Sequence, residues 1–281
     1  MTAFRAAAVQ LRSGLTPADN IADTERLVRA AAADGARYVL TPEMTNIVDK
    51  DRKRLLSTIS EAPEEPSLAR LRDLARELSI VLHVGSLAVR LPGDRVANRA
   101  FVIAPSGDIL ATYDKLHMFD VDLGDGEAYR ESSLYEAGRN AVVADAELAR
   151  IGVSICYDVR FPQLYRALAR EGAELLAVPA AFTRTTGQAH WEVLLRARAI
   201  ESGAFVVAAA QGGRHQDGRT TWGHSMIVSP WGTVLAVIDD EPGFVAADID
   251  LKEVREARSR IPALTHDRPF DVVTEHPGEA A

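Results

Sequence analysis

Residues 151–162 read IGVSICYDVRFP, and this stretch decides the fold class and carries the most reactive side chain. The apolar run 151–155 predicts a strand that ends at Cys156, and Pro162 opens a segment whose apolar spacing predicts a helix. A strand that turns into a helix exposes a side chain at the corner, beside backbone N–H groups that can bind a ligand. Cys156 is therefore a candidate nucleophile, although most free cysteines are buried and act as small hydrophobic residues. We interpret Asp158 and Arg160 as a local ion pair that shapes the turn.

Strand and helix patterns alternate on both sides of this corner. Before it, the sequence predicts helices at 17–33 and 68–78, and strands at 3–10, 38–41, 80–89, 96–103 and 109–113. After it, the sequence predicts helices at 162–171, 190–202 and near 251, and strands at 174–178, 205–210, 224–228, 234–238 and 244–249. No linker or repeat divides the series. We expect a single α/β domain over 1–270, with two sheets covered by helices, and a polar tail over 271–281.

Composition excludes several classes of protein. The chain has 281 residues, 47% of them hydrophobic, which is enough apolar material for a sizeable core. Its net charge of −8 argues against binding to nucleic acid or an anionic membrane, because both are bound through basic patches. No apolar run reaches the roughly 20 residues that span a bilayer, and the N-terminus lacks a signal-peptide pattern. The single cysteine excludes an internal disulfide, so we expect a cytoplasmic protein.

A thiol nucleophile needs a base and a group that stabilises an oxyanion. The histidines are scattered and indicate no Cys–His relay, so carboxylates and lysines are the next candidates. Glu43 follows the predicted strand 38–41, and Lys115 follows the strand 109–113 within an apolar and aromatic stretch. Like Cys156, both lie just past the carboxyl end of a strand, where open α/β sheets bind their ligands. Taken alone, either could be a solvated surface residue.

Three segments resemble the motifs of the nitrilase, or carbon–nitrogen hydrolase, superfamily. They are TPE at 41–43, YDKLH at 113–117 and ICYDVRFP at 155–162, in the order and spacing of that family. The resemblance covers residues 3–270. It implies a four-layer α-β-β-α sandwich that assembles through its outer helices into a homodimer or a larger homo-oligomer, with no cofactor.

The resemblance also implies roles for these residues. Cys156 would attack the carbon of an amide and form a thioester, which water then hydrolyses. Glu43 would be the general base for the thiol and for water. Lys115, with the backbone N–H of Tyr157, would hold the tetrahedral oxyanion, and its ammonium would help to lower the pKa of the thiol.

The long loop 117–141 has no periodicity, and loops of this length are often functional. The family's second glutamate belongs in it, and by resemblance we assign Glu131 as the carboxylate that supports Lys115, with Glu127 as the fallback. Asp120, Asp122 and Glu131 also match three positions of an EF-hand. The glycine required at its sixth position is missing and no helix pair flanks the loop, so we expect no metal.

The C-terminal half resembles the Nit subgroup of this superfamily at 180–201 and at 223–233. That subgroup contains ω-amidases, which act on α-ketoglutaramate, and deaminated glutathione amidases, and the segments 195–201 and 209–215 are more similar to the second. The resemblance implies an amidase that releases ammonia or an amine from a small anionic 2-oxo acid amide. Alternatives are an ω-amidase, an N-carbamoyl amide hydrolase, a catalytically silent scaffold, and a redox-sensing thiol; nitrile hydrolysis is the weaker expectation.

Both substrates carry a carboxylate, so the site should contain a cation or a helix terminus. Arg184, in the loop after 182, is the candidate cation, although it could equally be a solvated loop residue. His190 would line the pocket or cap the helix that starts there. Tyr157, next to the nucleophile, completes the expected substrate-binding residues.

Overall fold

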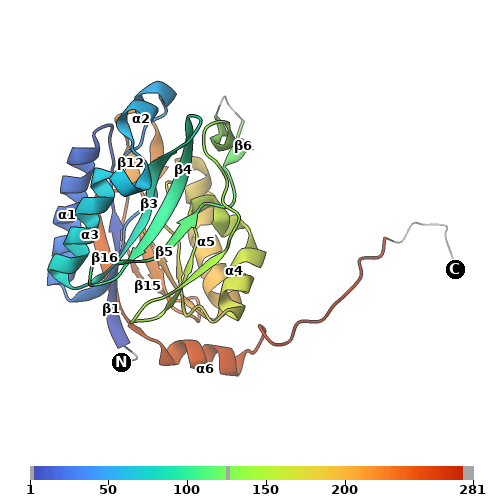
Figure 1. Cartoon of the computed structure of the whole chain (residues 1–281). Helices are drawn as coiled ribbons and strands as arrows, with labels where there is room; N and C mark the ends of the chain where they lie inside the picture. Colours follow the sequence, from blue (N-terminus) through green and yellow to red (C-terminus); the bar gives the residue numbers. More distant parts are fainter. Residues whose placement is uncertain (1–2, 125–126, 275–281) are drawn as a thin grey trace.

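The computed structural model describes residues 3–124 and 127–274. Two six-stranded sheets pack face to face, and helices cover the outer face of each, which confirms the predicted four-layer sandwich (Figure 1). The first sheet has the order β16 (Gly243–Asp250), β1 (Ala3–Gln10), β2 (Ala36–Leu40), β3 (Val81–Leu91), β4 (Arg95–Ile103) and β5 (Ile109–Asp114). The second has the order β15 (Val234–Val237), β14 (Met226–Val228), β11 (Phe205–Ala208), β10 (Leu175–Ala177), β9 (Arg150–Val153) and β8 (Val142–Asp145).

Parallel pairing occupies the middle of each sheet. Strands β1, β2 and β3 run parallel, as do β9, β10 and β11, while the other neighbours pair antiparallel. Helices α1 (Pro17–Ala33) and α3 (Pro66–Leu78) cover the first sheet, and α4 (Pro162–Arg170) and α5 (Arg184–Ser202) cover the second (Figure 1). Two short helices, α2 (Arg52–Thr58) and α6 (Lys252–Arg260), lie at opposite ends of the sandwich (Figure 1).

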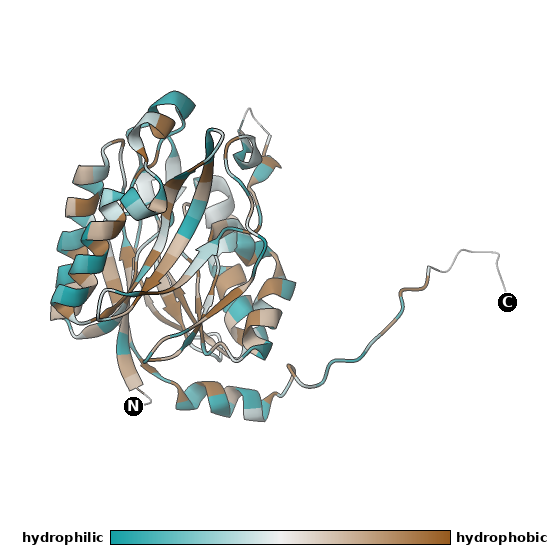
Figure 2. Cartoon of the chain, viewed as in Figure 1, coloured by the Kyte–Doolittle hydropathy of each residue, from teal (hydrophilic) through white to brown (hydrophobic). Residues whose placement is uncertain are grey.

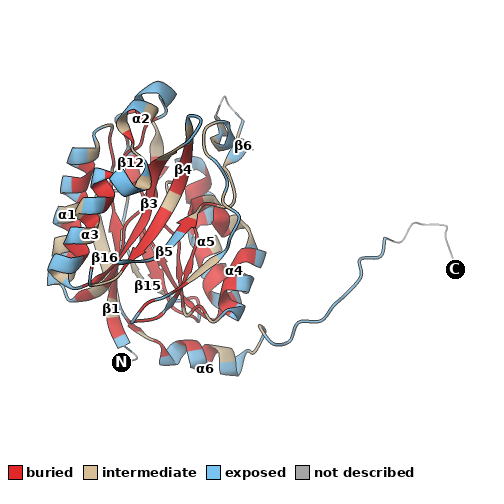
Figure 3. Ribbon diagram, viewed as in Figure 1, coloured by how far each residue is buried: buried red, intermediate tan, exposed pale blue. Residues whose placement is uncertain are grey.

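The core follows from the two-residue repeat of the strands. In β1, Phe4, Ala6 and Ala8 belong to the apolar cluster that includes the second sheet, while Ala7 and Val9 belong to the cluster with α1 and α3. Successive side chains of a strand point to opposite faces, so a strand covered on both sides is apolar throughout. Figure 2 and Figure 3 show that the hydrophobic and buried residues gather in the two sheets and on the inner sides of the helices. None of the described helices is long and apolar enough to cross a membrane.

Several elements differ from the predictions. Helix α5 begins at Arg184 and not at residue 190, because the Thr183 hydroxyl caps its N-terminus and accepts from the N–H of Thr186 at 3.3 Å. Its first turns contain Gly187, a poor helix former, where an added Cβ would lie 2.3 Å from the side chain of Trp222. The contact with Trp222 joins segments that are distant in the sequence, so the local sequence pattern does not predict it.

Part of the predicted loop 117–141 is ordered, which corrects the prediction. It holds a hairpin of β6 (Asp120–Asp122) and β7 (Ala128–Arg130) and a 3₁₀ turn at Glu131–Ser133. A second unpredicted hairpin pairs β12 (Gly212–Arg214) with β13 (Thr220–Trp222). Both lie at the end of the sandwich that also carries α2 (Figure 1). Beyond α6 the described chain extends away from the body, and residues 275–281 of the expected tail lie outside the described residues.

Candidate active site

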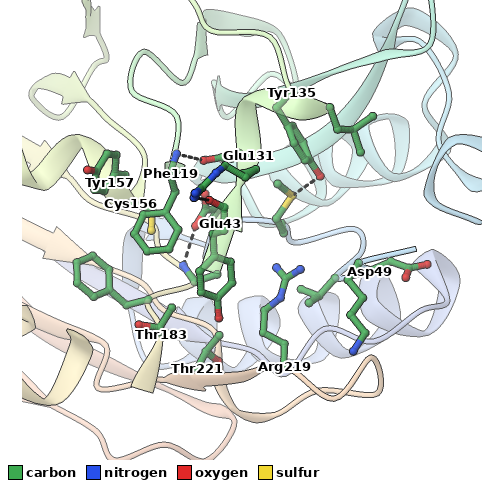
Figure 4. Close-up of a pocket in the computed structure, with 18 of the residues that line it drawn as sticks. Glu43, Asp49, Phe119, Glu131, Tyr135, Cys156, Tyr157, Thr183, Arg219 and Thr221 are labelled. Carbon is green, nitrogen blue, oxygen red and sulfur yellow. Dashed lines mark hydrogen bonds between the residues drawn. The ribbon is translucent and has the colours of Figure 1, made fainter. Parts of the chain in front are cut away.

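The sandwich brings three strand ends to one point. Glu43 follows β2, Lys115 follows β5 and Cys156 follows β9, and all three side chains are buried. The Lys115 ammonium lies 2.8 Å from Glu43 Oε1 and 2.9 Å from Glu131 Oε2. These residues and Tyr157 line a pocket of about 600 Å³ (Figure 4). The residues that sequence analysis assigned to catalysis therefore lie together.

The Glu43 carboxylate is fixed by donors from three directions. Its Oε1 accepts from Lys115 and from Asn98 Nδ2, at 2.8 Å each, and its Oε2 accepts from the N–H of Ala181 at 2.8 Å. Asn98 also donates to Glu131 Oε1 at 3.2 Å. A carboxylate with this many donors keeps one orientation, which a general base requires.

An irregular step in β3 holds the backbone around Glu43. The pairing of β3 with β4 shifts register between Val84 and Leu87. Within this step, Ser86 accepts at Oγ from the N–H of Met44 (2.9 Å), and Gly85 lies so close to the loop after β2 that an added Cβ would be 2.0 Å from the carbonyl of Thr41. Glycine is thus required by a close approach of two backbones.

Glu131 supports Lys115, and Glu127 does not. The Glu131 carboxylate accepts from Lys115 Nζ at 2.9 and 3.0 Å and from the N–H of Phe119 at 2.7 Å. Glu127 instead accepts from the hydroxyl of Tyr129 (3.0 Å), at the rim of the pocket. Figure 4 shows Glu131 directed toward the centre of the site.

Cys156 occupies a strained corner. Its φ of 50° lies in the left-handed region, which is uncommon for residues other than glycine and is often found at functional sites. Its N–H donates to the carbonyl of Pro179 at 2.8 Å. Within the described part of the chain, no hydrogen bond engages the next N–H, that of Tyr157.

Asp158 ties this corner to the strand that carries the lysine. The buried carboxylate accepts from the N–H of Ile155 (2.8 Å), the hydroxyl of Tyr113 (2.6 Å) and the N–H of His117 (3.1 Å), and His117 Nδ1 lies 2.7 Å from it. The predicted pair with Arg160 is therefore wrong, because the partner of Asp158 is His117. Sequence reasoning missed this connection and also missed Asn98.

Arg160 turns to the aromatic residues beside the corner. Its guanidinium lies 5.2 Å from the ring centre of Phe182 and 6.0 Å from that of Tyr157, within the range of a cation–π contact. Its Nη1 lies 3.3 Å from Nδ1 of His190.

The electrostatics of the cluster favour a neutral thiol beside an ionised carboxylate. Burial alone would lower the pKa of Lys115, but Glu131 and Glu43 raise it well above its ordinary value. Burial, the largest single effect, would raise the pKa of Glu43. The charge of Lys115 and the hydrogen bonds from Lys115, Cys156 and Asn98 together outweigh burial, so the pKa of Glu43 is lowered. Burial and then Glu43 raise the pKa of the Cys156 thiol, while Lys115 acts in the expected, opposite direction without prevailing. A thiol with a raised pKa needs a base to ionise, and the Glu43 carboxylate, hydrogen-bonded to Cys156, is placed to accept its proton.

Two of the expected substrate-binding residues do not line the pocket. Arg184 is exposed, with Nη1 3.7 Å from Asp240 Oδ2, and His190 is exposed beside Arg160. Tyr157 does line the pocket, which receives further cationic side chains from Lys50, Arg130 and Arg219. Sequence analysis did not single out these cations, since nothing local marks them.

No group of three or more histidine, cysteine, aspartate or glutamate side chains that could hold a metal ion occurs within 3–124 and 127–274. The EF-hand-like positions serve other contacts. Asp120 accepts from the N–H of Ser132 at 3.0 Å, while Glu131 binds Lys115.

Comparison with known proteins agrees with this geometry. The family model described as carbon-nitrogen hydrolase matches residues 5–259. A deaminated glutathione amidase of Synechocystis sp. is 39% identical over 270 residues, covering 95% of this chain and 98% of that protein. The human omega-amidase NIT2 is 37% identical over 268 residues, covering 95% and 96%. The crystal structure of the Caenorhabditis elegans NitFhit protein has a TM-score of 0.90 at 35% identity, covering 95% of this chain and 66% of that one.

Proposed function

Because the chain belongs to the carbon–nitrogen hydrolase family, we propose that Cys156 hydrolyses the amide of a small anionic 2-oxo acid, with deaminated glutathione as the preferred substrate. The chain is a hydrolase that acts on amides. The observation that carries the proposal is the buried contact of Lys115 with two carboxylates beside a cysteine in a pocket. A scaffold or a redox-sensing thiol has no need of this cluster.

The first half of the reaction forms a thioester. Glu43 takes the proton of the Cys156 thiol as sulfur bonds to the amide carbon, and the C=O electrons move to oxygen. Lys115 Nζ and the N–H of Tyr157 are the donors for this oxyanion. When the oxyanion collapses, the C–N bond breaks and the amine leaves with the proton that Glu43 held.

The second half uses the same groups on water. The oxygen of a water molecule attacks the thioester carbon, and Glu43, ionised again, accepts a proton from this water. The tetrahedral intermediate then releases the carboxylic acid, and the sulfur recovers its proton from Glu43. Because Glu43 alternates between base and acid, it needs one fixed orientation, and the contacts from Asn98 and Ala181 provide it.

We propose deaminated glutathione as the substrate ahead of α-ketoglutaramate for two reasons. Relatives called deaminated glutathione amidase include proteins of Synechocystis, Yersinia and human, at 38–39% identity. The pocket of about 600 Å³ also falls in the range of sites for drug-sized ligands, and so leaves room for a leaving group larger than ammonia. The second candidate, ω-amidase activity, is favoured by the 37% identity to human omega-amidase NIT2.

The test compares the two substrates directly. Release of cysteinylglycine from deaminated glutathione and of ammonia from α-ketoglutaramate gives kcat/KM for each. A higher kcat/KM for deaminated glutathione supports the proposal, and the reverse order would make the protein an ω-amidase. Activity on neither substrate, with turnover of an N-carbamoyl amide, would refute the proposed substrate class.

We propose that residues 1–270 act as one catalytic unit in a cytoplasmic homodimer or larger homo-oligomer. Support for self-association comes from apolar side chains on the outer face of α5 and its surroundings, where Val193, Ile200 and Trp231 are 68%, 54% and 56% exposed. An exposed apolar patch is typical of a protein interface. Light scattering on the purified chain gives the oligomeric state, and a monomer would refute this part.

A further inference from the structure

We propose that Arg219, with Lys50 beside it, binds the carboxylate on the 2-oxo acid part of the substrate. This assignment rests on the proposed function and deepens it, because it names the residues that select an anionic amide over a neutral one.

The catalytic cluster itself does not favour an anion. Two carboxylates, of Glu43 and Glu131, contact one ammonium, of Lys115, so the cluster carries a net negative charge when both are ionised. A substrate carboxylate that enters this pocket is repelled by the cluster, since like charges in a poorly solvated site cost free energy. Selection of an anionic substrate therefore requires a cation elsewhere on the pocket wall.

Most other charged side chains of the wall have partners already. Asp49 is paired with Arg54, whose Nε lies 2.6 Å from its Oδ2. Arg130 donates from Nη1 to the carbonyls of Val121 and Tyr129 at 2.9 and 2.8 Å. For Lys50, no hydrogen bond or ion pair is found with the described residues.

Arg219 is held in place but its guanidinium is only loosely paired. It stands in the turn between β12 and β13, where its N–H donates to Asp217 Oδ1 at 2.9 Å. Its Nη2 lies 3.6 Å from Asp217 Oδ2, too far for a hydrogen bond, and its side chain is 28% exposed. Figure 4 shows the side chain rising from the turn into the pocket. A fixed backbone with an unsatisfied guanidinium suits bidentate binding of a carboxylate.

Lys50 approaches the same spot from the other wall. A Cβ built on Gly218, the residue before Arg219, would lie 3.8 Å from Lys50 Nζ. The Lys50 ammonium therefore lies close to the turn that carries Arg219, and both residues line the pocket. Two positive charges on the wall of one pocket attract a substrate carboxylate that enters it.

The cations and the proposed nucleophile line the same pocket, so the carboxylate must be close to the amide carbon within the substrate. In α-ketoglutaramate the carboxylate is separated from the amide carbon by a few C–C bonds of about 1.5 Å each. Tyr135 also lines this pocket: burial and then Glu131 raise its pKa, and Arg219 lowers it.

The experiment measures kcat and KM for α-ketoglutaramate, which has a carboxylate on its acyl part only, and for pentanamide, which has none. We expect Arg219→Gln to raise KM for α-ketoglutaramate roughly 10- to 100-fold, because a hydrogen-bonded charge pair is lost. The change in kcat should be much smaller, and kcat/KM for pentanamide should change far less. Arg219→Lys should recover part of the loss, and Lys50→Gln should give a weaker effect of the same kind.

Arg214→Gln is the matched control, because Arg214 lies in the same hairpin, is exposed and does not line the pocket. Unchanged KM for α-ketoglutaramate in Arg219→Gln would overturn the assignment, as would an effect of Arg184→Gln in its place. An effect restricted to deaminated glutathione would also overturn it, since the carboxylate bound would then be that of the leaving group. If the unaltered protein hydrolyses pentanamide but no 2-oxo acid amide, the proposed function fails first and the assignment with it.

Discussion

Replacing Glu131 by glutamine removes one charge from the catalytic cluster and preserves its shape. The carboxylate accepts from Lys115 with both oxygens, at 2.9 and 3.0 Å, and from the N–H of Phe119 at 2.7 Å. A glutamine has one oxygen and one NH₂ group. Whichever oxygen is replaced, the NH₂ faces the Lys115 ammonium and a second donor, either the N–H of Phe119 or Nδ2 of Asn98. Lys115 then keeps only Glu43 as a charged partner, and the position of the ammonium is less well defined.

The cost to stability and the cost to catalysis should differ in size. One buried group left without a partner costs about 1–3 kcal/mol, which corresponds to a fall in Tm of about 2–12 °C. Because Lys115 is the proposed oxyanion donor, its displacement should lower kcat about 10²- to 10³-fold, as for the loss of an oxyanion contact. Thermal unfolding by circular dichroism and steady-state kinetics with deaminated glutathione measure the two effects.

Glu127→Gln is the matched control, since Glu127 lies in the same loop at the pocket rim but bonds Tyr129 instead of Lys115. It should change kcat by less than about threefold, as surface substitutions usually have small effects. The reasoning is refuted if Glu131→Gln retains kcat within threefold of the unaltered protein. It is also refuted if Glu127→Gln has the larger effect.

Three further outcomes are expected. Cys156→Ala should abolish turnover and leave the circular dichroism spectrum unchanged; turnover at the original rate would exclude Cys156 as the nucleophile. Gly85→Ala should lower the free energy of unfolding, measured in urea, by about 3 kcal/mol or more, because its Cβ would overlap the loop that carries Glu43. The control is Gly93→Ala, at a residue with a φ of 72° whose added Cβ would meet no neighbour; it should lower this free energy by about 1 kcal/mol. Equal losses in the two variants would contradict the argument. Because the pKa of Glu43 is lowered, activity and this carboxylate's contribution to stability should persist above pH 4.5 and fall as the pH drops through its folded pKa; a profile of kcat/KM that falls already between pH 7 and 6 would contradict this.

Each predicted catalytic residue could be found from the local sequence around it. Glu43, Lys115 and Cys156 each follow a strand whose apolar run is visible in the sequence, and the strand 3–10 and the helix 17–33 have the bounds predicted. The resemblance to family motifs then indicated that the three segments form one site, and the assignment of Glu131 also came from it. Strand patterns alone would not have brought the three ends to one pocket, because periodicity does not fix strand order.

The residues that were missed depend on contacts between distant segments. Asn98 lies inside β4, and its amide donates to Glu43, which follows β2, and to Glu131, in the 3₁₀ turn 131–133. Arg219 lines the pocket because it lies in the turn of the β12–β13 hairpin, whose strands are too short to show a strand pattern in the sequence. Arg184 was favoured because a loop was expected after residue 182. That segment is already the first turn of α5, and Arg184 is exposed, with Nη1 3.7 Å from Asp240 Oδ2. Local pattern does not contain this kind of information.

The solitary cysteine has a practical consequence. Since Cys156 carries the only thiol in the sequence, a thiol-specific reagent that modifies the folded protein reports on the pocket that Cys156 lines. The number of groups incorporated per chain then counts the accessible active centres, with no second cysteine to correct for. A substrate that occupies the pocket should slow the labelling, so the concentration dependence of this protection measures binding even for compounds that are never turned over. The fold thus provides a binding assay for candidate ligands that needs no engineered label.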